Sequence, residues 1–175
     1  VAPGRAAGIK GLAVLAAVHA VPEVRRVFIC IDASTDITAA AQGLPFSRIV
    51  PAASPAASVA AALAAIDGNR PLLVTTADHP LLTAEMIDHF LRQAPQEADL
   101  AVGLAEAGTV MARFPGAKRT FHRLGGHGYS GCNLFLARRP RAVRVAEYWR
   151  RMEAHRKRPL RLACEVGIFA LLRLV

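Results

Sequence analysis

Hydrophobic runs alternate with amphipathic or alanine-rich segments from about residue 9 to residue 107 of the chain. Apolar residues surround most of segment 9–20, which predicts a largely buried helix. Ser54-Pro55 can begin a second helix, which the turn formers at 67–69 end, and Thr83 can cap a third that runs to about Ala94. A short helix is expected at 34–42. Runs rich in β-branched and leucine residues predict strands at 26–32, 47–50, 71–78 and 99–107.

Strands that alternate with helices favour parallel pairing, because a parallel connection needs a long crossover that a helix can supply. The rhythm changes after Gly108, where strand-like runs separated by proline and glycine turns indicate an insertion or an antiparallel edge. Two helices joined at Pro159 are expected to end the chain. We therefore expect one three-layer α/β domain over residues 1–175, with a mostly parallel mixed sheet.

Composition narrows the class of protein. The chain is 53% hydrophobic, which argues against disorder, and carries a formal net charge of +9. That excess favours anionic partners, although an alanine- and arginine-rich composition with a solvated basic face explains it equally well. No apolar run reaches the ~20 residues of a membrane helix and no signal peptide is evident, so we expect a cytoplasmic protein. Cys30 and Cys132 lie in apolar runs and are expected to be core residues.

Asp78 is the main candidate for chemistry. It follows a strand-like apolar run and precedes His-Pro and the start of a helix. Ligands of α/β sheets collect at the carboxyl ends of strands, and a carboxylate there can bind Mg²⁺ and substrate phosphates. The alternative is that Asp78 only caps the turn that follows it.

The segment LLVTTADHPLLTAEMI (72–87) resembles the strand–Asp–x–Pro signature of the MobA-like NTP transferase superfamily. This resemblance implies a Rossmann-like fold of the nucleotide-diphospho-sugar transferase type and a Mg²⁺ ion bound by Asp78. It also implies transfer of a nucleoside monophosphate from an NTP to a phosphorylated or hydroxyl acceptor, with release of pyrophosphate. The expected partners are therefore an NTP and a small anionic acceptor, without a membrane or nucleic acid.

Other segments match the superfamily in the same order along the chain. VAPGR (1–5) resembles the end of its nucleotide loop, and GGHGYSGCNLF (125–135) resembles the strand that lines the acceptor side. PAASPAASVAAAL (51–63) resembles its base-recognition stretch, and AKRTF (117–121) and RKRP (156–159) are similar to a bacterial subgroup. The residues that these matches implicate in binding or catalysis are Gly4, Arg5, Lys10, Ser54, Ser58, Lys118, Arg119, Asn133, Arg156 and Lys157.

Some parts of the superfamily pattern are missing. The sequence has no counterpart of the first strand, of most of the glycine loop, of a segment near residues 10–14 or of the second metal-binding carboxylate. The domain is therefore expected to be incomplete at both ends. Two alternatives stay open: a nucleotide-binding protein without activity, and a glycosyltransferase of related fold. The second is disfavoured by the absence of a D-x-D triplet.

Overall fold

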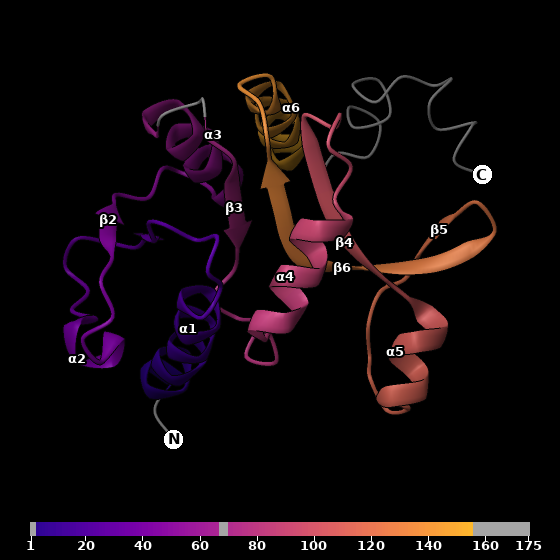
Figure 1. Ribbon diagram of the computed structural model, residues 1–175, viewed down its shortest axis with the longest axis horizontal. Helices are drawn as coiled ribbons and strands as arrows, with labels where there is room; N and C mark the ends of the chain where they lie inside the picture. The colour runs from indigo at the N-terminus through magenta and orange to yellow at the C-terminus, as the bar shows by residue number, and fades with distance from the viewer. Residues whose placement is uncertain (1–2, 67–69, 156–175) are drawn as a thin grey trace.

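The computed structural model describes residues 3–66 and 70–155, with the backbone alone described at 3–10, 39–40 and 152–155 (Figure 1). The expected turn at 67–69, the basic residues Arg156 and Lys157 and the second C-terminal helix lie outside the described residues. The elements, in chain order, are α1 (Pro3–His19), β1 (Phe28–Cys30), α2 (Thr38–Ala41), β2 (Ser47–Ile49), α3 (Pro55–Ala65), β3 (Leu72–Thr75), α4 (Ala84–Gln93), β4 (Leu100–Glu106), α5 (Ala107–Arg113), β5 (His122–Leu124), β6 (His127–Ala137) and α6 (Ala142–His155).

The strands confirm a mixed α/β protein but pair differently from the expectation of a mostly parallel sheet. β1 and β2 form a separate parallel pair, whereas a second sheet has the order β3-β6-β4, with β5 paired to β6. β6 is antiparallel to β3, β4 and β5. The late strand, expected to be part of an insertion or an antiparallel edge, is antiparallel but occupies the middle of its sheet. Pairing is a long-range property, so the local alternation of strands and helices did not reveal that β6 lies between β3 and β4.

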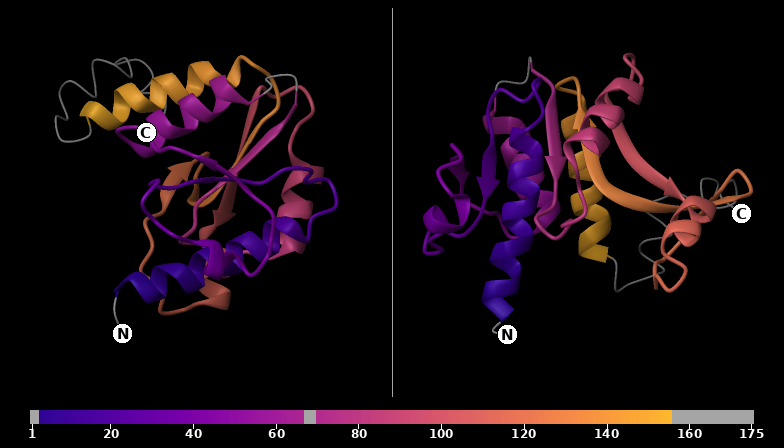
Figure 2. Two further views of the ribbon diagram at one scale, coloured as in Figure 1. Left: turned by 90° about the vertical axis from the view of Figure 1, so that its left-hand side faces the viewer. Right: turned by 60° about the horizontal axis from the view of Figure 1, so that its bottom comes forward.

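Helices cover both faces of the β3-β6-β4 sheet. On one face, Leu134 of β6 packs with residues of α1 and α4, among them Val14 and the fully buried Ile87. On the other face, Val74 and Phe135 lie beneath α3 and α6, which run side by side over the sheet (Figure 2, left). The alternation of side chains along β6 therefore places its successive residues in two separate apolar layers.

Two helix starts follow the capping residues that the sequence indicated. The Ser54 hydroxyl accepts a hydrogen bond from the Ala57 amide at 3.2 Å, and the Thr83 hydroxyl accepts one from the Met86 amide at 3.3 Å. These bonds satisfy amide groups that have no partner within the first helical turn. The predicted starts of α3 and α4 are therefore confirmed.

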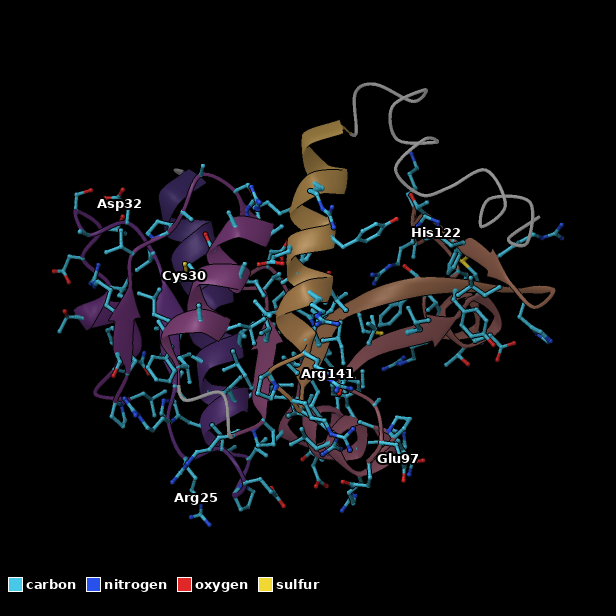
Figure 3. All side chains as sticks on the ribbon, turned by 90° about the horizontal axis from the view of Figure 1, so that it is seen from above. Arg25, Cys30, Asp32, Glu97, His122 and Arg141 are labelled. Carbon is cyan, nitrogen blue, oxygen red and sulfur yellow. The ribbon has the colours of Figure 1, made fainter. Side chains whose placement is uncertain are left out.

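Three local expectations were wrong. The strand-like run after Gly108 is helix α5, and the helix expected at 34–42 is reduced to the short α2. Cys30 (Figure 3), expected in the core, is exposed at the end of β1. Cys132 is half-buried on β6. A three-residue strand with a partner on one side only leaves its last side chain open to solvent. None of the helices among the described residues has the length and hydrophobicity needed to cross a bilayer.

Candidate functional site

The chain leaves β3 at Thr75 and enters a polar turn that contains Asp78. The Asp78 carboxylate is exposed, and its Oδ1 atom accepts a hydrogen bond of 2.5 Å from the Thr76 hydroxyl. Leu82 closes the turn by donating its amide to the His79 carbonyl at 3.1 Å. Because Leu82 is buried, this turn is anchored to the core while Asp78 faces solvent. The Asp78 carboxylate therefore has free lone pairs with which to bind a cation.

Helix α1 passes beside the Asp78 turn. A Cβ atom added to Gly11 would lie 3.8 Å from the Ala77 Cβ, so the helix backbone reaches the residue next to Asp78. The helix begins at Pro3, and Gly4 lies in its first turn rather than in the extended loop that the resemblance implied. The side chains of Arg5 and Lys10 lie outside the described part of the chain.

Strand β6 is irregular where it extends beyond the end of β3. Leu134 is opposite Thr75, the last residue of β3, so Asn133 occupies the next position toward the Asp78 turn. Asn133 has a positive φ of 52°, and the register between β4 and β6 shifts at Gly103. Such bulges bend a strand and redirect a side chain. The result is an exposed amide side chain at the same edge of the sheet as Asp78.

Arg119 reaches this edge from the loop between α5 and β5. Its Nε atom donates to the Ser130 hydroxyl at 3.1 Å, and its Nη2 atom donates to the Gly131 carbonyl oxygen at 3.0 Å. Burial of the His79 imidazole lowers its pKa, and the nearby charge of Arg119 lowers that pKa further, whereas Asp78 acts to raise it. His79 is therefore within electrostatic reach of both charged groups. Lys118, next to Arg119, is exposed.

The loop that enters α3 is organised by its two serines. The Ser58 hydroxyl donates to the Ser54 carbonyl oxygen at 3.0 Å and accepts from the Ala52 amide at 2.9 Å. Val59, in the first half of α3, lines a pocket with Val74 of β3. Ile66, at the end of α3, lines a second pocket with Leu72, the first residue of β3. The helix therefore runs antiparallel to β3. Its N-terminus and Ser54 therefore point toward the end of β3 that leads to Asp78. The single hydroxyl proton of Ser58 is thus engaged within the loop.

The residues at this edge suit a magnesium ion better than a softer metal. Mg²⁺ prefers oxygen ligands, keeps several waters and commonly takes one or two carboxylates together with substrate phosphates. Asp78 supplies an accessible carboxylate, and Asn133 supplies an amide oxygen at the same edge. The described residues contain no group of three or more His, Cys, Asp or Glu side chains that could hold a metal without substrate. The donor set thus fits an ion shared with a polyphosphate.

Three side chains at this edge were not identified from the sequence as part of a site. Thr76 orients the Asp78 carboxylate, Ser130 holds Arg119, and His79 follows Asp78 within reach of the Arg119 charge. Thr76 could have been found from the polar residues that end the apolar run of β3. Ser130 had no such signal, because its role depends on a side chain from a distant loop.

Comparison with known proteins places this arrangement in a family. A solved structure described as a hypothetical transferase from Thermus thermophilus is 32% identical, with a TM-score of 0.74, and the match covers 94% of this chain and 67% of that one. No curated protein matches the chain. The family model described as the MobA-like NTP transferase domain matches residues 12–161, which include Asp78, Arg119 and Asn133. The chain therefore belongs to the MobA-like NTP transferase family.

Proposed function

We propose that this protein transfers a nucleoside monophosphate from an NTP to a phosphorylated or hydroxyl acceptor, with Asp78 holding the required Mg²⁺ ion. The family implies an NTP substrate. In the reaction, an acceptor oxygen attacks the α-phosphorus and forms a new P–O bond. The bond from the α-phosphorus to the bridging oxygen breaks, and pyrophosphate leaves with the electron pair. A hydroxyl acceptor also loses its proton to solvent or base, whereas an ionised phosphate has none to lose.

The observation that carries the proposal is the exposed Asp78 carboxylate at the end of β3. A bound Mg²⁺ ion would neutralise negative charge on the phosphates. The chain's own residues bind and align the reactants, which is most of what phosphoryl transfer requires of a protein. Thr76 fixes one oxygen of Asp78 and leaves the other free for the ion.

The remaining candidates surround this carboxylate. Arg5 and Lys10, on the helix that passes Ala77, would add positive charge for the triphosphate. Ser54, at the N-terminus of α3, would contact the nucleoside, since its hydroxyl proton is not used by the helix cap. Asn133 and Arg119 would face the acceptor across the same edge. These assignments rest on the family resemblance together with the position of each residue at one end of the sheet.

An exchange of Asp78 tests the proposal. Asp78→Asn keeps the size of the side chain but removes its charge, so we expect pyrophosphate release with Mg²⁺ to fall by at least about 100-fold. Asp88→Asn is the matched control, because Asp88 is a carboxylate on α4 that forms an ion pair with Arg92 of the same helix. Both variants should unfold in urea at nearly the wild-type midpoint. Full activity of Asp78→Asn, or equal losses in the two variants, would refute the assignment of the metal site to Asp78.

A further inference from the structure

The Arg119 side chain is held in place by β6 although its guanidinium group is exposed. Ser130, only 5% exposed, and the Gly131 carbonyl together accept two of its N–H groups. A guanidinium has five N–H donors in a planar fork, so the others remain free to bind a ligand. None of the ion pairs within the described residues involves Arg119. Its charge is therefore fixed in position and left uncompensated by the described carboxylates.

The position of this charge follows from its two acceptors. Ser130 and Gly131 lie on the part of β6 that precedes Leu134, the residue opposite Thr75 at the end of β3. Asn133 lies on the same part of β6, which extends toward the turn that contains Asp78. The guanidinium thus lies over the same edge of the sheet as the proposed metal carboxylate.

We propose that Ser130 is the positioning residue of a phosphate-binding clamp, in which Arg119 is held by Ser130 and the Gly131 carbonyl and presents its free N–H groups to a phosphate group of a substrate. A planar guanidinium matches two phosphate oxygens at once, and a guanidinium already fixed by the protein loses little freedom on binding. Without Ser130, Arg119 would keep its charge but lose its orientation. The clamp rests on the proposed function, since it assumes that phosphate-bearing substrates bind at this edge.

A double-mutant cycle separates positioning from a merely structural role. Arg119→Gln, Ser130→Ala and the double variant are compared with wild type, with Arg123→Gln as the matched control. Arg123 is an exposed arginine on β5, opposite Gly128. Binding is measured calorimetrically in two arms on the full chain. One uses each NTP with Mg²⁺, and the other uses inorganic phosphate as the stand-in for an acceptor phosphate.

We expect Arg119→Gln to weaken one of the two arms by about 10–100-fold, the effect of losing a charge-assisted hydrogen-bond pair. Ser130→Ala should weaken the same arm by about 3–10-fold. The double variant should bind no more weakly than Arg119→Gln alone, because Ser130 acts only through Arg119. The affinity of Arg123→Gln in both arms should stay within about twofold of the wild-type affinity, because loss of one surface charge has only a small effect. The arm that responds identifies the source of the phosphate.

Two results obtained with the variants would overturn the clamp. One is a Ser130→Ala effect that persists in full when Arg119 is already Gln, and the other is an Arg119→Gln variant that binds as tightly as wild type in both arms. Absence of binding of any NTP to the wild-type protein refutes the proposed function instead. The phosphate arm still decides the clamp in that case, because it does not depend on nucleotide. Absence of wild-type binding in both arms refutes both.

Discussion

The left-handed backbone conformation at Asn133 can be tested by its effect on stability. Asparagine tolerates a φ of 52° better than most residues, alanine does not, and glycine adopts it freely. Because the Asn133 side chain is exposed, replacing it changes little buried area. The comparison of Asn133→Ala with Asn133→Gly therefore isolates the backbone term. We expect the alanine variant to be less stable than the glycine variant by about 1 kcal/mol.

Urea and thermal unfolding measure this difference. For a chain of 175 residues, about 1 kcal/mol corresponds to a lowering of Tm by about 2–4 °C. Both variants lack the amide, so both should lose affinity for the acceptor if Asn133 contacts it, while only the alanine variant loses stability. Equal stability of the two variants would show that Asn133 is not left-handed in the folded protein. That result would also refute the bulge that directs the Asn133 side chain toward the Asp78 edge.

Two further predictions concern the sheet and the cysteines. Gly103→Ala places a Cβ atom 3.1 Å from the Cβ of buried Leu134 and should lower the free energy of unfolding by about 1 kcal/mol. Gly108→Ala, in open space on α5, should raise it by about 0.5 kcal/mol. If urea unfolding shows Gly103→Ala to be the more stable variant, the register of β4 and β6 is contradicted. Iodoacetamide at pH 8 should label Cys30 faster than Cys132, because burial raises the pKa of the Cys132 thiol and reduces its thiolate fraction. Mass spectrometry of the two peptides measures the labelling rates. Equal rates at pH 8 would refute the burial of Cys132.

Local features of the fold were predictable from the sequence. The starts of α3 and α4 depend on hydrogen bonds from Ser54 and Thr83 to amides three residues away, so a short stretch of sequence contains both partners. The existence of β3 and β4 likewise follows from apolar runs. The position of Asp78 just after β3 needed only the strand and the turn that ends it. These are the elements in which sequence neighbours are also spatial neighbours.

The pairing of the strands was not predictable in the same way. Leu134 and Leu136 of β6 show an alternation that indicates a buried face, and this pattern is the same for a central strand and for an edge strand. Besides β5, the neighbours of β6 are β3, more than fifty residues earlier, and β4, about thirty residues earlier. No local signal reports which of them it joins. The prediction of a mostly parallel sheet was therefore wrong, because the antiparallel strand β6 lies between β3 and β4.

The same distinction explains which site residues could be found. Asp78 was identified because a carboxylate just after a buried strand is visible in one segment of sequence. The pairing of Arg119 with Ser130 joins a loop to a strand through a long side chain, and nothing in either segment specifies the other. The family resemblance supplied Arg119 as a candidate but gave no reason for its orientation. That reason, two acceptors on β6, appears only in the folded chain.

The irregularity of β6 links the pairing of the strands to the geometry of the site. Three of its residues, 132–134, lie opposite Gly103 alone on β4, so β6 carries two additional residues at this point. An even number of additional residues keeps the later side chains on their original faces, and Leu134 and Leu136 can therefore remain in the core. Gly103 has no Cβ atom to collide with Leu134. The fold thus accommodates an excursion of β6 beside the Asp78 turn without disturbing its core, and the excursion is what turns Asn133 outward at the edge where Arg119 is anchored.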